Sequence, residues 1–564
     1  MTTARITPEL FPGQLVRSSG RALVISALAL IVLLGFGFRA FQLGAESLSE
    51  DELNKVRAVE EYRSRGLTSA NGEHPLLMKA LLTASVVAAE RWNASGVAQA
   101  RPELQVSVEG AARLPGAIFG ALTSLLIFLV AAELFGVEVG LIAAALWAFG
   151  PAAIGFNRIA KEDTFLLFFF LLANVFWLRG QRVAEEGRDN PTPFYWAAAA
   201  SFGAMMASKY VPHFLSISVS YYYIFQGVPA TRWRMGKRRW LLFFAVMGLV
   251  FLVCNPTILL PGTWHEMRIF AGEKRIGHDS YEFMGELYRN QMTLWLNGSP
   301  WYFYYVFIGV KLPLPVVAAF LAGLPLLFTK RLGDGRFFLL FWAFFWFFPF
   351  TVLGGKFTRY FTFALPVVLM TAAIGIHAAS QQLARLAASR FAAGDVKRSY
   401  LRAGMACAVV AFSAYASAGA APHYRLYTNA LGGGAERAGS YFPHDEFYDS
   451  STRETVEAVA GSARAGARLA SETPGLVSYY ARRAGRDDLA SVSLSDGEAT
   501  GGLAEGDVVI VARGRRYFSN DKLVAELRAA ARPAAEIRLG GVPSAEIFVL
   551  DEPALAAVGR AVGP

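Results

Sequence analysis

The sequence predicts an all-α polytopic membrane protein that ends in a small α/β domain. Three observations predict this fold class. Apolar runs of about 20 residues, the length of a helix that crosses a bilayer, recur along the chain. Only 17% of the 564 residues are charged, whereas soluble domains carry about 25%. After residue 421 the long apolar runs end, and short helix and strand patterns alternate instead.

Eleven apolar runs are expected to cross the membrane and to form a transmembrane domain over residues 1–421. The first run has no small-residue cleavage site, so we interpret it as a retained helix rather than a signal peptide. The runs lie near residues 21–43, 114–134, 137–157, 163–179, 193–209, 211–226, 240–260, 302–328, 337–353, 358–378 and 401–421.

Basic residues gather in alternate loops, which is the pattern of cytoplasmic loops. These loops carry Arg232, Arg234, Lys237, Arg238 and Arg239, then Lys330, Arg331 and Arg336, and then Arg385, Arg390, Lys397, Arg398 and Arg402. The net charge of +10 therefore indicates orientation, and no nucleic-acid partner is expected. This topology predicts a multi-pass protein of the cell (inner) membrane with its active site and C-terminal domain on the extracytoplasmic side.

Two outer loops are long enough to hold structure of their own. In the loop 44–113, residues 53–65 and 76–92 predict helices that lie on the membrane surface. A membrane-crossing helix at 76–92 would reverse every later segment and send the most basic loops outside. The loop 261–300 is polar and aromatic, and we expect it to cover the substrate.

Residues 422–564 predict an extracytoplasmic α/β domain that follows a glycine linker at 432–434. Helices are expected at 451–462 and 520–531, and short buried strands at 468–471, 507–511 and 546–550. Both cysteines, Cys254 and Cys407, fall inside apolar runs, which argues against a disulfide framework or a cysteine metal site. No phosphate-binding glycine loop is present.

Two carboxylate segments stand out from the apolar sequence. Asp51 and Glu52 follow the first run, and Asp163 opens the fourth. Ionisable groups at membrane depth are costly and tend to be functional, and Asp51 is suited to act as a general base that water can reach. The alternative for Asp51 and Glu52 is helix capping. For Asp163 the alternative is a structural ion pair with Arg158.

Several cations fall on the predicted outer face. Lys209, Lys311, Lys356 and Arg359 lie at the outer ends of spans or just within them, and Lys79 lies one turn into the surface helix 76–92. Cations that converge on a carboxylate-bearing face would form a phosphate site, whereas snorkelling to the headgroups explains any one of them. A metal site built from His265, Glu266, His278 and Asp279 is less expected, because their spacing matches no compact ligand motif. The run His444-Asp445-Glu446 is expected to be a polar turn.

Together these motifs resemble the polyprenyl-phosphate-sugar-dependent glycosyltransferases with the GT-C fold, over roughly residues 20–380. The resemblance is to the protein O-mannosyltransferase group and its bacterial relatives, which include the aminoarabinose transferase that acts on lipid A. The matching residues are Asp51 and Glu52; His74, Pro75, Leu77 and Lys79; Arg113, Pro115 and Gly120; Arg158 and Asp163; Lys209, Tyr210 and Val211; and Lys356, Arg359 and Tyr360. Leu76, Met78 and Asn54 depart from the motifs, and Asn54 weakens the lipid A assignment because that branch tends to have arginine there.

The resemblance implies an inverting transfer of a sugar, with mannose as the family default, from a polyprenyl-phosphate carrier to a hydroxyl of a protein or glycan. Asp51 would deprotonate the acceptor, with Asp163 and Glu52 as further catalytic candidates. The implied substrate-binding residues are His74, Lys79, Arg113, Arg158, Lys209, Lys356, Arg359 and Tyr360. The carrier is expected to be held among membrane lipids. No cofactor is expected to be required, and dependence on a divalent metal stays open.

Two functions of other classes compete with this one, and a lipid A-type sugar transferase is the alternative within it. A transporter or lipid flippase would have repeat symmetry and charged sites at mid-membrane, whereas the unusual charges here lie at the predicted outer surface. A non-catalytic scaffold that presents the C-terminal domain would not depend on Asp51.

Overall fold

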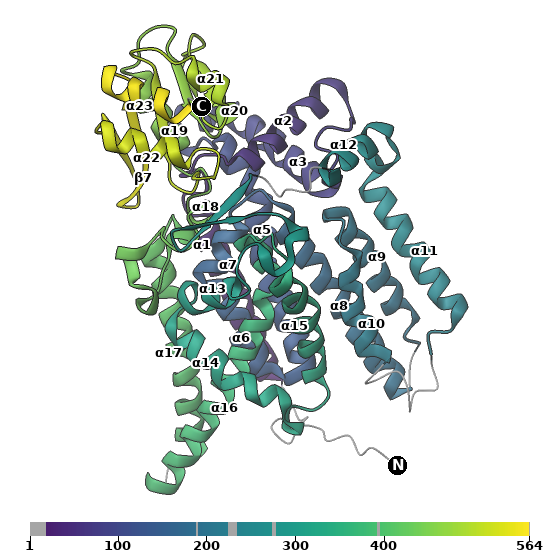
Figure 1. Ribbon diagram of the computed structural model, residues 1–564. Coiled ribbons are helices and arrows are strands. Elements are labelled where there is room, and N and C mark those ends of the chain that lie inside the picture. Colours follow the sequence, from purple (N-terminus) through teal and green to yellow (C-terminus); the bar gives the residue numbers. More distant parts are fainter. Residues whose placement is uncertain (1–17, 188–189, 224–233, 273–277, 392–394, 563–564) are drawn as a thin grey trace.

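The computed structural model describes residues 18–187, 190–223, 234–272, 278–391 and 395–562. Arg232 and the side chains of Arg390 and Lys397 lie outside the described parts. A bundle of helices makes up most of the molecule, and a smaller α/β region covers one end of it (Figure 1). The predicted fold class, an all-α membrane bundle with a C-terminal α/β region, is thereby confirmed.

Helices occupy all eleven predicted apolar runs. They are α1 Ser18–Ala40, α5 Val108–Phe135, α6 Val137–Phe149, α7 Pro151–Asn157, α8 Glu162–Glu186, α9 Thr192–Ser208, α10 Leu215–Tyr221, α11 Lys237–Cys254, α13 Phe303–Lys311, α14 Leu314–Gly323, α15 Gly335–Val352, α16 Leu365–Phe391 and α17 Asp395–Ala420. Among the described residues, six helices are long and apolar enough to cross a membrane, or seven if α6 and α7, which meet at 61°, form one span. The count of eleven spans stays a prediction.

The two predicted surface helices are α2 Glu50–Arg65 and α3 Leu76–Asn93. Both lie at the end of the bundle that faces the C-terminal region (Figure 1). A capping box starts α2, because Ser49 accepts from the Glu52 N–H while the Glu52 carboxylate accepts from the Ser49 N–H. This cap sets the direction in which the first turn of α2 presents its acidic side chains.

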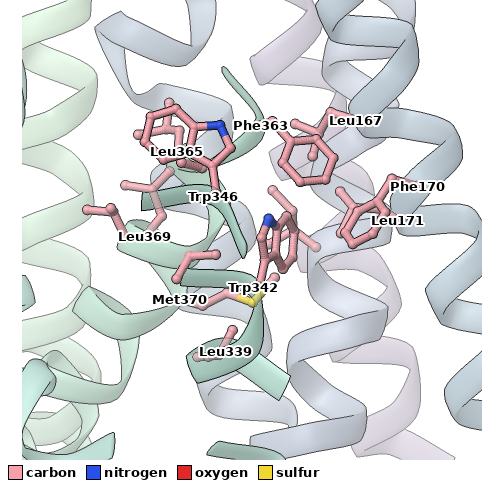
Figure 2. Close-up of a cluster of buried hydrophobic side chains, with 14 of the residues drawn as sticks. Leu167, Phe170, Leu171, Leu339, Trp342, Trp346, Phe363, Leu365, Leu369 and Met370 are labelled. Atoms are coloured by element: carbon pink, nitrogen blue, oxygen red, sulfur yellow. The ribbon is translucent and has the colours of Figure 1, made fainter. Parts of the chain in front are cut away.

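Aromatic packing holds the bundle together beneath that end. Trp342 of α15 is fully buried and lies edge-on against Phe170 of α8 at 4.8 Å between ring centroids. Phe363 stacks on Phe214 at 3.8 Å and meets the same Trp342 (Figure 2). Phe363 belongs to the short 3-10 helix η8 Thr358–Phe363. The packing therefore fixes the segment that carries Arg359.

The loop 261–300 contains α12 Pro261–Gly272 and a hairpin of β1 Ser280–Phe283 and β2 Glu286–Arg289. The hairpin lies between the bundle and the C-terminal region: Tyr281 donates to Asp445 at 2.7 Å, and the Met284 N–H donates to the Tyr441 carbonyl. Its expected role in covering the substrate stays a prediction.

The C-terminal region is a mixed five-stranded sheet with helices. Its elements are α18 Pro443–Phe447, α19 Thr452–Ala460, β3 Arg468–Ser471, α20 Pro474–Arg483, β4 Ala490–Ser493, α21 Gly497–Gly501, β5 Val508–Ala512, α22 Asp521–Ala530, β6 Ala535–Leu539, β7 Val542–Val549 and α23 Glu552–Val562. The strand order is β4-β3-β5-β7-β6. Strands β4, β3 and β5 run parallel, β7 pairs antiparallel with β5, and β6 pairs antiparallel with β7 at the edge of the sheet. The sequence patterns indicated β3, β5 and β7 but not β4 or β6.

The glycine segment 432–434 is not a loose linker. Asn429 donates to the carbonyls of Gly309 and Leu312 at 2.7 Å each, so the segment is bound to the end of α13. A Cβ at Gly432 would meet Val310 at 2.9 Å, a distance that leaves room only for glycine. The chain after α17 therefore packs on the bundle before the α/β region begins. The predicted boundary at residue 421 stays untested.

Candidate functional site

Asp51 lies in the first turn of α2, and three side chains from other parts of the chain contact its carboxylate. Lys161 Nζ is 2.8 Å from Oδ2, Arg359 Nη2 is 3.8 Å from Oδ2, and the Tyr448 hydroxyl donates to Oδ2 at 2.6 Å. The Asp51 side chain remains 35% exposed. It is therefore a carboxylate that is held by cations and still reachable from outside.

Electrostatics keep Asp51 ionised. Burial alone would raise the pKa of Asp51, but the charges of Lys161, Arg359 and Lys55 outweigh it and hold the pKa well below its usual range. Lys55 acts from a distance, because its own ammonium pairs with Glu162 at 3.0 Å in the interior.

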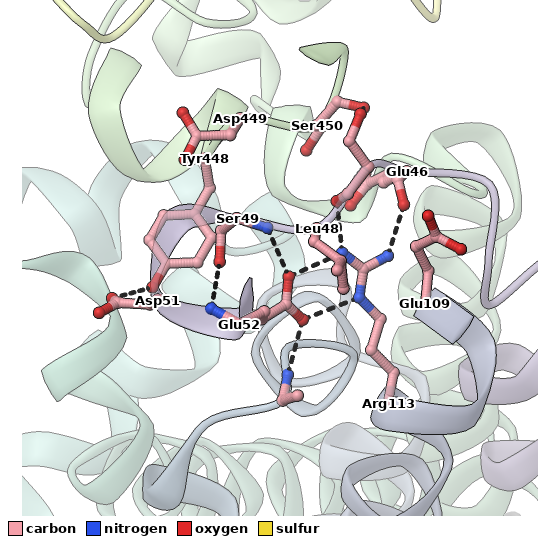
Figure 3. A network of polar contacts seen from close by, with 12 residues as sticks. Glu46, Leu48, Ser49, Asp51, Glu52, Glu109, Arg113, Tyr448, Asp449 and Ser450 are labelled. Carbon is pink, nitrogen blue, oxygen red and sulfur yellow. Dashed lines mark hydrogen bonds and ion pairs between the residues drawn. The ribbon is translucent and has the colours of Figure 1, made fainter. Parts of the chain in front are cut away.

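Glu52 and Arg113 form a buried ion pair beside this site (Figure 3). Arg113 donates to both carboxylate oxygens at 2.8 Å and also binds the carbonyl of Ser47 at 2.6 Å. Glu52 also accepts the Ala160 N–H at 2.8 Å. Both side chains are satisfied by these bonds. These contacts position α2 against the turn that carries Lys161, and the expected catalytic role of Glu52 and substrate contact of Arg113 stay predictions.

Asp163 and Lys209 form a second charged pair. Their atoms Oδ1 and Nζ are 2.6 Å apart, and the Lys209 ammonium lies 5.0 Å from the centre of the Tyr360 ring. The other oxygen of Asp163, Oδ2, is buried and accepts no hydrogen bond. Asp163 therefore pairs with Lys209 and not with Arg158, and one of its oxygens has no donor in the structure.

Arg359 shares the Tyr360 ring with Lys209: the two cationic groups lie 5.5 Å and 5.0 Å from the ring centre. Its guanidinium stacks over the Phe357 ring at 4.0 Å and lies 3.6 Å from Asp445 as well as 3.8 Å from Asp51. One of its nitrogens, Nη1, is buried without a hydrogen bond. Arg359 Nη1 and Asp163 Oδ2 are thus two buried polar atoms that make no hydrogen bond within the described part of the chain.

The segment before α19 completes the site from the C-terminal region. Asp445 accepts from Tyr281 and from the Thr358 N–H at 2.7 Å each, which ties it to the residue before Arg359. Tyr448 and Asp449 both have left-handed backbone conformations, with φ of 46° and 62°, a strain that clusters at functional sites. The expectation of a polar turn at 444–446 is wrong, because these residues are buried in α18.

Four predicted cations point away from Asp51. Lys79 Nζ bonds to the carbonyls of Ala70, Asn71 and His74; Lys356 to those of Ser299 and Leu353; Arg158 to those of Arg39, Phe41 and Gln42; and Lys311 to Glu446. Each of the four head groups is enclosed and uses its donors to fix a turn or a buried pair. In this structure Lys79, Arg158 and Lys356 therefore have structural roles, and their expected phosphate contacts stay predictions.

His74 lies behind the site. Its Nδ1 is 3.6 Å from the Glu162 carboxylate, and burial holds the pKa of His74 well below its usual range, so the ring is neutral. His74 supports the Lys55–Glu162 pair and is not brought to Asp51.

No group of three or more His, Cys, Asp and Glu residues able to hold a metal is found among the residues that the structure describes. His265 and Glu266 lie on α12. His278 stacks on Tyr517 at 4.0 Å, and Asp279 accepts the N–H groups of Phe518 and Ser519. These four residues contact different partners, and the structure does not gather them.

Comparisons with known proteins agree with this architecture. Residues 99–260 match the model of a family described as dolichyl-phosphate-mannose-protein mannosyltransferase. The chain is similar in structure to the oligosaccharyltransferase of Archaeoglobus fulgidus, with 12% identity, a TM-score of 0.50 and coverage of 87% of this chain and 69% of that chain.

It is also similar to ArnT from Cupriavidus metallidurans, solved bound to undecaprenyl phosphate, with 14% identity, a TM-score of 0.45 and coverage of 96% of this chain and 99% of that one. A third similar structure is the arabinofuranosyltransferase AftD from Mycobacteria, with 13% identity, a TM-score of 0.37 and coverage of 94% and 40%. No curated protein matches the chain in sequence.

The fold and the matched family model define the class: the chain is a membrane glycosyltransferase with the GT-C fold. Within that class, the part that matches the protein mannosyltransferase family runs from the end of the first outer loop to the end of α11. The resemblance seen in the motifs is thereby confirmed.

Proposed function

We propose that this glycosyltransferase moves a sugar, with mannose as the first candidate, from a polyprenyl-phosphate carrier to an acceptor hydroxyl, with Asp51 as the general base. The observation that carries the proposal is the reachable Asp51 carboxylate between Lys161 and Arg359. A base for the acceptor and cations for a phosphate leaving group are thus within one small region.

The matched family supports a lipid-phosphate donor, because its description names dolichyl-phosphate-mannose. A sugar on such a carrier needs a site for one phosphate at the membrane surface, and no nucleotide pocket. Lys161, Arg359 and Lys209 supply the charge for that phosphate. Arg359 Nη1 lies 3.6 Å from Asp445 but makes no hydrogen bond, and the planar fork of the guanidinium suits phosphate oxygens.

The reaction is a single displacement with inversion. The acceptor oxygen forms the new bond to the anomeric carbon and gives its proton to Asp51. The bond from that carbon to the carrier phosphate breaks, and the phosphate oxygen keeps the electron pair. Cations placed where this negative charge develops stabilise the transition state.

Donor binding also explains how a carboxylate with a depressed pKa serves as a base. While Lys161 and Arg359 face Asp51 alone, they make it a weak proton acceptor. A bound phosphate shares the same cations, so the pKa of Asp51 rises toward its ordinary range. Asp51 thus becomes a stronger base when the donor is in place, and the Tyr448 hydroxyl keeps its carboxylate oriented.

The proposed acceptor is a serine or threonine hydroxyl of a protein, or a glycan hydroxyl, on the extracytoplasmic side of the inner membrane. Residue 54, where the lipid A-modifying branch tends to have arginine, is an exposed asparagine. Arg57, one turn later, donates to the Gly475 carbonyl of the C-terminal region. The cation beside Asp51 comes from Lys161 instead, which favours a protein or glycan acceptor over lipid A.

The decisive experiment compares purified wild type with Asp51→Asn. Each protein receives a panel of radiolabelled polyprenyl-phosphate sugars, and the release of polyprenyl phosphate and the bound donor are measured in parallel. We expect release by wild type alone while the variant still binds donor. Asp334→Asn serves as the matched control, because Asp334 is an exposed aspartate at the N-terminal end of α15, away from Asp51.

Equal release by wild type and Asp51→Asn would remove Asp51 from the mechanism. If wild type bound no donor of the panel, a transporter or scaffold would become the better interpretation.

A further inference from the structure

A large basic groove lies between α16 and α17, far from Asp51. Its volume is about 550 Å³. It is lined by Gln381, Ala384, Arg385, Ala388 and Ser389 of α16 and by Arg398 and Arg402 of α17. The lining residues of α16 come 16 to 24 positions after the start of that helix. This places them roughly 25–35 Å along the helix from its end near Asp51. The groove is thus at the opposite end of the bundle, where α16 and α17 extend beyond their neighbours (Figure 1).

The groove has an excess of positive charge. Three arginines line it. Arg402 pairs with Glu138, whose carboxylate also lies 3.1 Å from His377. The Nε atom of Arg402 is buried and has no hydrogen-bond partner. A buried guanidinium N–H that no protein group accepts leaves a donor for an anion in the groove.

Small side chains make room between the charges. Ala384 and Ala388 are one turn apart on α16, and Arg385 and Ser389 follow the same spacing beside them. Residues four apart lie on one helix face, so a floor of alanine methyl groups is bordered by an arginine and a hydroxyl. A basic loop that only sets the orientation of a membrane protein needs positive charge and no particular shape. The recess between these helices therefore needs another explanation.

The groove is also at the right depth for a lipid headgroup. With 27 and 26 residues, α16 and α17 are each about 40 Å long, whereas the hydrocarbon core is about 30 Å thick. Their far ends therefore reach the headgroup layer. Beside the groove, Leu383, Leu386 and Leu401 are exposed and offer apolar surface to acyl chains.

We propose that this groove binds the headgroup of an anionic phospholipid, with its phosphate between Arg385, Arg398 and Arg402 and its acyl chains along the exposed leucines. Basic pockets between membrane helices are suited to such headgroups. The inference does not depend on the proposed function, because no residue of the groove lies near Asp51.

The test measures binding of a fluorescent phosphatidylglycerol to the full-length protein in phosphatidylcholine nanodiscs. Arg385→Gln combined with Arg398→Gln removes two charges, and Ala388→Phe fills the recess but keeps every arginine. Lys237→Gln combined with Arg238→Gln is the control, because these two exposed cations lie on α11, away from the groove.

We expect saturable binding by wild type and by the control. The double arginine variant should bind roughly 10- to 30-fold more weakly, since each basic residue near an anionic lipid contributes about a factor of five. Ala388→Phe should weaken binding to a similar degree although its charge is unchanged.

Four results would overturn the proposal. Equal binding of phosphatidylglycerol and phosphatidylcholine would remove the charge preference. If Ala388→Phe bound the lipid as tightly as wild type, the recess would not be the site. If the α11 control lost as much affinity as the double arginine variant, the effect would depend only on the total charge of the protein. Release of the bound lipid by polyprenyl phosphate at a lower concentration than by unlabelled phosphatidylglycerol would assign the groove to a different lipid.

Discussion

The hydroxyl of Tyr448 donates a 2.6 Å hydrogen bond to Asp51, although the two residues are 397 positions apart in the chain. Arg359 lies against both of them, 3.8 Å from the Asp51 carboxylate and 5.7 Å from the centre of the Tyr448 ring. The C-terminal region is therefore part of the candidate site and not only an attached domain.

Tyr448→Phe should lower kcat about 10- to 100-fold, because a hydrogen bond to a charged group is worth about 1.5–3 kcal/mol. The KM for the donor should change little, since Tyr448 orients the base and does not face the phosphate. Initial rates of polyprenyl-phosphate release check both constants. Tyr424→Phe is the matched control, because Tyr424 is another buried tyrosine, and its hydroxyl binds the Phe38 carbonyl. Equal losses in the two variants would argue for a general packing effect.

Lys161→Gln should weaken donor binding by about 10- to 100-fold, because it removes a charge-assisted contact to the phosphate. Equilibrium binding of a labelled polyprenyl-phosphate sugar measures the change, and exposed Lys330→Gln is the control. Lys79→Gln should behave differently: its ammonium holds three carbonyls of the 70–74 turn, so it should lower the thermal stability and leave the donor affinity of the folded protein unchanged. A large loss of donor affinity in Lys79→Gln would return Lys79 to the phosphate site.

The pH dependence of transfer should shift when Lys161 is removed. In the folded protein the pKa of Asp51 is depressed, so Asp51 contributes stability above its unfolded pKa of about 4 and loses it as the pH falls through the lower folded value. In Lys161→Gln that pKa should rise, and the acid limb of the kcat profile should move to higher pH than in wild type. An acid limb that does not move would mean that another group sets it.

Breaking the Glu52–Arg113 pair should destabilise the protein by about 3–5 kcal/mol, because a buried charge would lose its partner. Thermal unfolding in detergent should show this for Glu52→Gln and for Arg113→Met. The double variant should recover part of the loss, since neither charge is then left alone. If Glu52→Gln instead kept full stability but lost activity, Glu52 would return as a catalytic candidate.

Charge at membrane depth made much of the site predictable from the sequence. Asp51, Asp163, Lys209 and Arg359 stand out from an apolar chain, and the structure brings all four to one end of the bundle. The sequence assigns Lys161 no role, because a lysine at a span end looks the same whether it snorkels or pairs with a carboxylate.

Other contacts could not be predicted, because they depend on how distant segments meet. Nothing in the sequence around Tyr448 indicates that it packs against residue 51. Lys79 was expected to reach outward, but the turn before α3 offers three carbonyls within reach of its ammonium. A buried cation with satisfied donors and an exposed one have the same sequence pattern.

The distance in sequence between Asp51 and Tyr448 has a consequence for how the enzyme is made. At about 5–20 residues per second, the ribosome needs roughly 20–80 s after Asp51 to reach Tyr448, and by then all the helices of the bundle have been synthesised. The growing chain therefore carries Asp51, the proposed base, long before Tyr448 can orient it. Asp51 should remain without its tyrosine partner during membrane insertion, and sugar transfer should become fully competent only when the C-terminal segment arrives.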